Sequence, residues 1–367
     1  MNIDISSLKT QVQMNCNISD ARHAGVYSLC GLLLRLRDLY KWENSIPPWQ
    51  EPPPEVLLEW VESKEALWET LASLEFQPLD LGGRQFDPFD SDAVNGLLRP
   101  SGLRYGAGYG VGMKPTFFLA LLADTLKVQE LTVDIVEHEL ARDIFAAPAM
   151  RQGGQVFARR SPMLFFLWDQ IMEMRPSARN ALVFALSQYG LEAEPLRRAP
   201  RQFDARLREI SRSELDVWIH HEIGEARSTA FTGDTWPEIV SSYSNTPVEI
   251  YARVIKDLIA DTHDEGLFSH IIRNRIRSTL GFYMAWMRPF TRVLFPEAID
   301  AFNRFRDNGD WSGLSAARDF GFARACRNAH ALVELHEAGR GREHDRTTRL
   351  IIAELIEPLG IFGKENH

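Results

Sequence analysis

The sequence predicts an all-α protein of about a dozen helices in two packed helical domains. Apolar residues recur every three or four positions along most of the 367-residue chain, which is the period of a helix. Hydroxyl, acidic or proline residues precede several of these segments, as they do at helix N-termini. No segment shows the alternation of strands, the spacing of βαβ units or a repeat of fixed period. The composition, 45% hydrophobic and 25% charged, is that of a folded protein.

The first two helices are predicted from apolar stripes. Ser19 is the expected N-cap of a helix that runs to Trp42. Its buried stripe consists of Leu29, Leu32, Leu33, Leu36 and Leu39. Residues 46–54 contain five prolines and cannot be helical, so the second helix begins only at residue 54.

The rest of the first half is expected to be irregular and then helical. Residues 76–115 are rich in Gly, Asp and Pro and show no periodicity, so they are predicted to form a long irregular region. Helices are then predicted at residues 116–128, 132–146, 159–173 and 177–189. The last of these starts at Ser177 and stops at Gly190.

A domain boundary is predicted at residues 191–203, which contain two prolines and no apolar stripe. This linker separates an N-terminal domain, residues 1–190, from a C-terminal domain, residues 204–367. Helices of the second domain are expected at residues 204–231, 266–306, 312–338 and 345–357. The helical run at 266–306 must bend or break at Pro289 and Pro296.

Two capping boxes add helix starts between these segments. Thr235 with Glu238, and Thr246 with Glu249, have the spacing at which a hydroxyl at the N-cap and a glutamate three residues later satisfy each other's backbone N–H groups. A proline lies early in the first turn of each, where its fixed φ fits a helix.

The charge balance argues against nucleic acid as a partner. The 41 basic residues are outnumbered by 50 acidic ones, so the chain lacks the basic excess that phosphate neutralisation needs. Arginine outnumbers lysine 34 to 7, which fits either buried ion pairs between helices or codon usage. The sequence leaves open that the chain binds another protein or a second copy of itself.

Localisation follows from what the sequence lacks. The longest apolar runs fall far short of the roughly 20 residues that span a bilayer, so no membrane partner is expected. The N-terminus does not have the pattern of a signal peptide. Three cysteines without paired spacing, Cys16, Cys30 and Cys326, predict no disulfide framework. We therefore expect a cytoplasmic protein.

The glycine-rich segment 104–116 is a candidate anion-binding site. Glycine occupies every second position, at Gly106, Gly108, Gly110 and Gly112. Because a helix is predicted to follow, N–H groups at its N-terminus could hold an anion beside Arg104, Tyr105 and Lys114. Met113 and Pro115 interrupt the ending of a P-loop. The competing interpretation is a tight loop whose glycines give clearance against a helix.

Histidines beside carboxylates are the candidate metal ligands. They include His220 and His221, with Glu225 one turn further along. On a helical wheel, His221 and Glu225 lie opposite the apolar stripe, which predicts that they face solvent. The spacing matches neither the Glu-x-x-His pairs of di-iron bundles nor the HExxH motif of zincins.

One stretch, residues 257–270 (DLIADTHDEGLFSH), carries an apolar helix into His-Asp-x-Gly. It resembles the metal motif of the all-α HD-domain phosphohydrolases. The resemblance implies that His263 and Asp264 hold a metal. The resemblance also implies two further metal ligands. One is an upstream histidine, either His220 or His221, and the other is a later aspartate, either Asp300 or Asp307. The stretch departs from the family pattern at Thr262, where an apolar residue is expected, and it is two residues shorter than in the nucleotide triphosphohydrolase branch.

Three further segments, residues 17–43 (NISDARHAGVYSLCGLLLRLRDLYKWE), residues 103–120 (LRYGAGYGVGMKPTFFLA) and residues 218–286, reach across most of the chain. They resemble a group of uncharacterised, all-helical bacterial proteins of unknown function. The resemblance implies a bacterial protein and carries no activity.

Two functions remain. The first is a binding or scaffold protein with no cofactor, which uses a groove between the domains or the irregular region 76–115. The second is a metal-dependent, HD-like phosphohydrolase acting on nucleotides or phosphate esters. It predicts that at least three His, Asp or Glu side chains from residues 216–264 and 300–337 lie within roughly 2–2.5 Å of one divalent ion. The sequence favours the first, because no ligand set is complete by motif.

Overall fold

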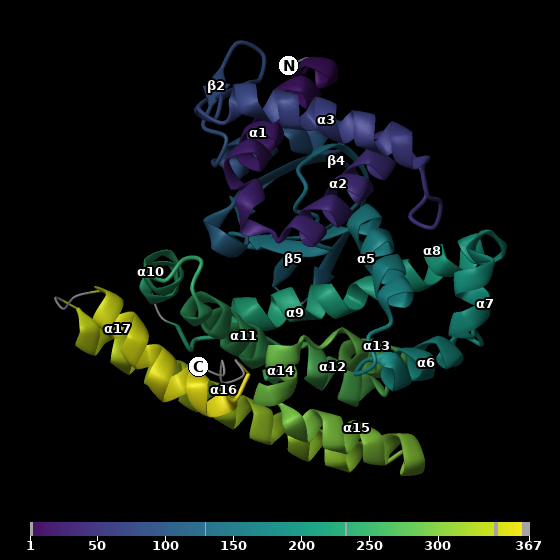
Figure 1. The fold of residues 1–367 in the computed structure, drawn as a ribbon, viewed down its shortest axis with the longest axis vertical. Coiled ribbons are helices and arrows are strands. Elements are labelled where there is room, and N and C mark those ends of the chain that lie inside the picture. The colour runs from purple at the N-terminus through teal and green to yellow at the C-terminus, as the bar shows by residue number, and fades with distance from the viewer. Residues whose placement is uncertain (1–2, 129, 232, 341–343, 362–367) are drawn as a thin grey trace. The chain divides into compact units, whose positions relative to one another are not determined.

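The computed structural model describes residues 3–128, 130–231, 233–340 and 344–361 (Figure 1). The chain divides into two compact units. Unit 1 comprises Met1–Asp169 and Ala199–Leu215, and unit 2 comprises Gln170–Arg198 and Asp216–His367. The predicted linker, residues 191–203, forms the short helix α7 (Ala193–Arg198) and the 3-10 helix η4 (Pro200–Phe203).

Unit 1 contains a five-stranded mixed sheet, so the prediction of an all-α fold is wrong. Its strands follow the order β3-β4-β5-β7-β6, and only β5 and β7 are parallel neighbours. The strand bounds are Leu103–Tyr109 (β3), Pro115–Val128 (β4), Leu131–Arg142 (β5), Ala149–Gln152 (β6) and Gln155–Arg159 (β7). A separate two-stranded sheet pairs β1 (Leu79–Asp80) with β2 (Gln85–Phe86).

Two predicted helices, 116–128 and 132–146, are the strands β4 and β5. The first half of β4 is buried on both faces. Phe118 packs with Val136 and Phe157 on one face, whereas Phe117 and Leu119 join the core on the other. A strand that is buried on both faces has a continuous apolar run, which periodicity alone does not distinguish from a buried helix.

The alternating glycines belong to β3 and its turn. Successive side chains of a strand point to opposite faces, so glycines at every second position leave one face bare. A Cβ at Gly106 would overlap the ring of Phe118, and one at Gly110 would press on the ring of Phe145. Gly112 adopts a left-handed φ of 65° in the turn between β3 and β4. The spacing of the glycines at every second position therefore indicates a strand.

Helices complete unit 1, and Figure 1 shows α1 and α3 beside the sheet. The first part of the chain forms α1 (Ile5–His23), α2 (Leu29–Glu43), α3 (Pro54–Leu71) and α4 (Ser91–Leu98), with short 3-10 turns at Ala24–Val26, Arg99–Ser101 and Val111–Met113. α5 (Arg160–Glu173) begins directly after β7, and α8 (Asp204–Ser213) returns to this unit. Ser19 is buried inside α1, and Ser28 caps α2 instead. The irregular region 76–115 thus holds β1, β2, α4 and β3.

α1 is fixed to the sheet by a buried ion cluster. Lys114, at the start of β4, places its Nζ 3.0 Å from Asp20 of α1 and 3.6 Å from Asp143, just after β5. All three side chains are at most 1% exposed. Asp143 also accepts the backbone N–H of Phe117 at 2.9 Å, and Asp20 accepts that of Ile144. Burial alone would lower the pKa of Lys114, but Asp143 and Asp20 outweigh it and raise this pKa.

Among the described residues of unit 2 there are helices but no strands. Its helices are α6 (Arg179–Gln188), α7, α9 (Leu215–Arg227), α10 (Thr235–Ser242), α11 (Pro247–Thr262), α12 (Leu267–Asn274), α13 (Arg277–Trp286), α14 (Pro289–Leu294), α15 (Pro296–Asn308), α16 (Trp311–Gly339) and α17 (His344–Ile351). A π-helical turn (Ile352–Ile356) and a 3-10 turn (Glu357–Leu359) follow. The long α16 packs against α11 and α15.

Several predicted boundaries in unit 2 can be compared directly. The breaks at Pro289 and Pro296 are confirmed, because these prolines begin α14 and α15. Thr246 occupies the predicted N-cap position of α11, but its hydroxyl donates to the carbonyl of Tyr243 and makes no capping hydrogen bond. Asp234, one residue before Thr235, is the N-cap of α10. None of the helices in the described ranges combines the length and apolar character needed to cross a membrane.

At pH 8, above the pKa of Asp20, replacing Lys114 by Met is expected to lower the free energy of unfolding by about 3–5 kcal/mol, because two carboxylates would be left buried without their cation. Unfolding in guanidinium chloride, followed by circular dichroism, measures the change. Lys127→Met is the matched control: Lys127 is exposed near the end of β4, and its loss should change stability by less than about 0.5 kcal/mol. Equal stabilities of the two variants would contradict the role given to the cluster.

The cluster also predicts a pH dependence. Burial raises the pKa of Asp20 to about 7, against the opposing effect of Lys114. Between pH 5 and 7 the native state then holds a proton that the unfolded state has lost, so this group's contribution to stability falls as the pH rises. Unfolding curves from pH 5 to 7.5 should show a smaller fall in Asp20→Asn than in the wild type. Parallel curves would show that Asp20 does not titrate in this range.

Candidate functional site

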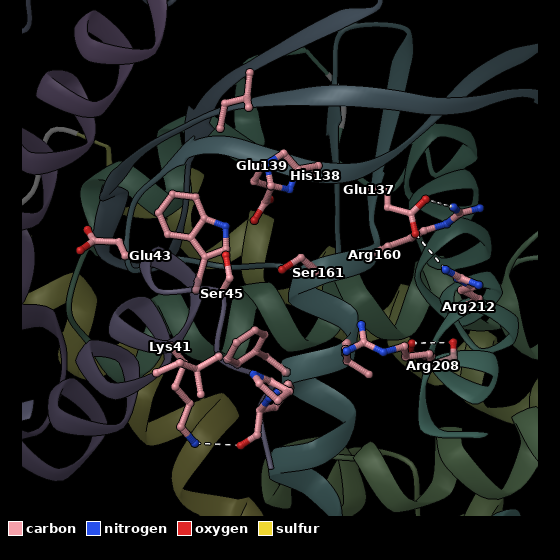
Figure 2. Close-up of a pocket in the computed structure, with 18 of the residues that line it drawn as sticks. Lys41, Glu43, Ser45, Glu137, His138, Glu139, Arg160, Ser161, Arg208 and Arg212 are labelled. Atoms are coloured by element: carbon pink, nitrogen blue, oxygen red, sulfur yellow. Dashed lines mark hydrogen bonds and ion pairs between the residues drawn. The ribbon is translucent and has the colours of Figure 1, made fainter. Parts of the chain in front are cut away.

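A cavity of about 570 Å³ opens in unit 1 (Figure 2). Its walls come from α1, α2 with the proline-rich loop after it, β5, α5 and α8. Its volume is in the range of sites that hold small molecules. The lining cations are Lys9, Lys41, Arg160, Arg208 and Arg212, and the lining carboxylates are Glu43, Glu137 and Glu139.

β5 supplies four consecutive lining residues, Glu137 to Leu140. A regular strand would point alternate residues to opposite faces. The register of β5 with β4 shifts near both ends of this stretch, since Leu121 and Leu122 pair with His138 and Val136, and Leu119 and Ala120 pair with Ala141 and Glu139. These irregularities re-aim the side chains, and Glu137 and His138 are both exposed.

Two arginines converge on Glu137. Figure 2 shows its carboxylate between Arg160, the first residue of α5, and Arg212 of α8. The distances are 2.7 Å to Arg160 and 2.9 Å to Arg212. Partial burial would raise the pKa of Glu137, but the hydrogen bond from Arg212 and the charge of Arg160 lower it. Glu137 therefore stays ionised and holds both guanidinium groups at the cavity.

Two more arginines, which are buried and do not line the cavity, neutralise Glu139. Arg159 Nη2 lies 2.5 Å and Arg142 Nη1 3.4 Å from its carboxylate, and all three side chains are buried. Aromatic rings cover the guanidinium faces: Arg159 lies 4.5 Å from the ring of Phe118, and Arg142 lies 4.9 Å from that of Trp42. Burial lowers the pKa of Arg142, against the effect of Glu139. Four arginines thus share two glutamates at this wall.

Three other charged residues of the cavity lining have ion-pair partners of their own. Lys41 is fully buried and donates to Glu51 and to the carbonyl of Pro48, at 2.8 Å each. Glu43 pairs with Lys64. Arg208 pairs with Asp204 on α8. The cavity lining thus carries five cations against three carboxylates, and the buried Arg142 and Arg159 lie behind Glu139.

Unit 2 holds a second polar cluster, built on α9. His221 Nδ1 lies 2.7 Å from Asp261 of α11, and its Nε2 lies 3.7 Å from Glu225 and 3.9 Å from Asp257. Burial would lower the pKa of His221, but Asp261, followed by Asp257 and Glu225, raises it to about 10. Lys256 pairs with the other oxygen of Glu225.

The neighbouring residue, His220, has a different environment. Its ring stacks on that of His270 of α12, with centroids 3.5 Å apart. His270 Nε2 in turn lies 3.6 Å from Asp216. Burial, together with the charge of His270, lowers the pKa of His220 to about 4. Adjacent residues on a helix point about 100° apart, which explains why the two pKa shifts have opposite signs.

Family comparisons divide the chain into two matched parts. A family of unknown function (DUF6866) matches residues 7–159 with its N-terminal domain and residues 164–354 with its C-terminal domain. The second match alone covers more than half of the chain. The chain belongs to the DUF6866 family. No curated protein and no solved structure matches it.

In this DUF6866 chain, the residues of the predicted anion site form ion pairs and hydrogen bonds that stabilise the sheet. Arg104 forms a buried ion pair with Asp134, and the Tyr105 hydroxyl donates to the carbonyl of Pro88 at 2.7 Å. Gly108 lies in β3, and the N–H of Gly110 donates to the carbonyl of Lys114 within the β3–β4 turn. Lys114 is the buried cation of the ion cluster. A strand, not a helix, follows the glycines, so no helix N-terminus is available there.

The predicted metal ligands separate into different places. His221 and Glu225 come together with Asp257, which the sequence reasoning missed, and His220 joins Asp216 and His270. His263 accepts the N–H of Glu265 at 3.1 Å and packs against Phe322, while the exposed Asp264 pairs with Arg318. Within the described residues, neither belongs to a group of three potential ligands. Three carboxylate or imidazole groups from residues 216–264 do converge, but without the His-Asp pair of the HD resemblance.

Gly224 allows α9 to approach α11 between His221 and Glu225. A Cβ at this position would overlap the carbonyl oxygen of Ala260. Gly224→Ala should therefore lower the free energy of unfolding by about 1–3 kcal/mol or more. Gly313→Ala is the control, because Gly313 is near the start of α16 with open space around its Cβ position. There the better helix propensity of Ala should stabilise by up to about 1 kcal/mol. Equal effects in urea unfolding would show that the two helices can separate freely.

Proposed function

We propose that this protein is a binding protein whose cavity in unit 1 takes a small molecule with an anionic group, a carboxylate or a phosphate. The observation that carries the proposal is the excess of positive charge in the cavity lining, which holds five cations against three carboxylates. The cations are Lys9, Lys41, Arg160, Arg208 and Arg212, and the carboxylates are Glu43, Glu137 and Glu139, of which Glu139 is already neutralised by the buried Arg142 and Arg159. Arginine presents paired donors that match the oxygens of carboxylates and phosphates.

The position of α5 supports the same ligand class. This 14-residue helix begins at Arg160, and its first turn, with Ser161, lines the cavity. The N-terminus of a helix carries partial positive charge, which favours an anion. The rings of Trp42 and Phe165 and the side chain of Leu164 supply apolar wall for the rest of the ligand.

The proposal includes the source, the cell compartment and the partners that the sequence predicts. We infer a bacterial, cytoplasmic protein with neither nucleic acid nor membrane as a partner. The net charge of −9 argues against nucleic acid, and the three free cysteines fit a reducing compartment. The ligand is then a small anionic molecule and not a polymer such as nucleic acid.

Matched arginine variants on α8 test the cavity. Arg212 lines the cavity and is 54% exposed, while Arg206 on the same helix is 45% exposed, pairs with Glu209 and lies outside the cavity lining. Isothermal titration with inorganic phosphate, pyrophosphate, citrate and ATP should identify at least one ligand. Arg212→Gln should weaken its binding about 10-fold or more, because a charged hydrogen bond is lost, and Arg206→Gln should not. Binding of none of the four, or equal weakening by both variants, contradicts the proposal.

A further inference from the structure

The cluster on α9 and α11 combines one imidazole with three carboxylates. His221 and Glu225 are four residues apart on α9, and Asp257 and Asp261 are four residues apart on α11. Side chains with this spacing lie on one face of a helix. Two facing helices therefore direct four potential ligands into one space, as metal sites in helical proteins do.

Asp261 gives His221 the orientation of a metal ligand. With Nδ1 bonded to Asp261 at 2.7 Å, the imidazole turns its Nε2 toward Glu225 and Asp257. Histidines that bind metals usually have their other ring nitrogen bonded to a carboxylate or carbonyl in this way, which sets the tautomer and holds the ring in place.

The separations fit one ion with a small closure of the side chains. The Nε2 of His221 lies 3.7 Å from Glu225 Oε1 and 3.9 Å from Asp257 Oδ1, and the potential ligand atoms of the three residues lie within 4.8 Å of one another. Ligands about 2.0–2.2 Å from a tetrahedral or octahedral ion are separated by about 3–3.6 Å. Lys256 binds Oε2 of Glu225, so Oε1 is the oxygen that faces His221.

We propose that His221 Nε2, Glu225 and Asp257 form a binding site for a divalent transition-metal ion, with Asp261 as the outer carboxylate that orients His221. One nitrogen and two carboxylate ligands suit ions that accept both donor types, such as Zn²⁺ and Mn²⁺. The ion links α9 to α11 at the point where Gly224 brings the helices together.

The adjacent group of His220, His270 and Asp216 is the alternative location. Its imidazole rings are stacked, with 18° between their planes. A histidine nitrogen donates its lone pair in the plane of the ring, so two stacked rings direct their lone pairs side by side and do not converge on one ion. This group serves as the control.

Titration calorimetry of the full chain, stripped with a chelator and then dialysed, tests the site with ZnCl₂ and separately with MnCl₂. At least one of the two should bind with one ion per chain and should raise the unfolding temperature. Asp257→Asn should weaken this binding at least ~100-fold through loss of a ligand, and Asp261→Asn should weaken it ~10–100-fold through loss of the outer carboxylate. Asp216→Asn is the matched control, since Asp216 and Asp257 are 48% and 39% exposed and both neighbour a histidine, and it should bind as the wild type does.

Circular dichroism and unfolding of the metal-free variants establish that each is folded, and Glu225→Gln, which also removes a ligand, replaces Asp257→Asn if that variant does not fold. Binding of neither ion overturns the proposal. So does binding that Asp257→Asn retains, or binding that Asp216→Asn loses, because the ion would then lie elsewhere. The site is independent of the cavity in unit 1, so the anion titrations do not bear on this result.

Discussion

The structure of unit 1 depends on a lysine that has no access to solvent. Lys114 joins α1, through Asp20, to the start of β4 and to the residue after β5, Asp143. Such a cluster is costly to desolvate, but once formed it resists any change that leaves one charge alone. It therefore specifies where α1 lies on the sheet. The cavity depends on that position, because Lys9 and Gln13 of α1 form part of its wall.

Side-chain amides from two helices form hydrogen bonds with backbone groups of the sheet that have no neighbouring strand at that position. The amide of Gln13 on α1 exchanges hydrogen bonds with the backbone of Arg142, at the end of β5. Asn95 on α4 does the same with the backbone of Tyr105, on the edge strand β3. Pairing the edge in this way leaves fewer backbone groups open to another chain. The helices that flank the sheet are thus bonded to it as well as packed on it.

The high arginine content has a structural use in unit 1. Arg104, Arg142 and Arg159 are buried and paired with carboxylates, which lysine would do less well because its compact ammonium is harder to desolvate and cannot bond bidentately. This supports the interpretation of buried ion pairs, although two of them connect strands, the third lies within β5, and none connects helices. Arg142 and Arg159 also stack on aromatic rings, which a planar guanidinium does favourably.

Local sequence predicts most helices of unit 2, because prolines such as Pro289 and Pro296 act locally and leave few alternatives, but α7 lies where a linker was expected. It also placed His220, His221 and Glu225 on one helix. That β4 and β5 are strands becomes apparent only from their packing, since burial on both faces hides the period of two. Only the tertiary structure brought Asp257 and Asp261 to His221, and gathered Arg142, Arg159, Arg160 and Arg212 around two glutamates. Apart from Arg142 and Glu139, which are three positions apart, these contacts join residues 20 to 75 positions apart, and their geometry depends on packing that no local pattern records.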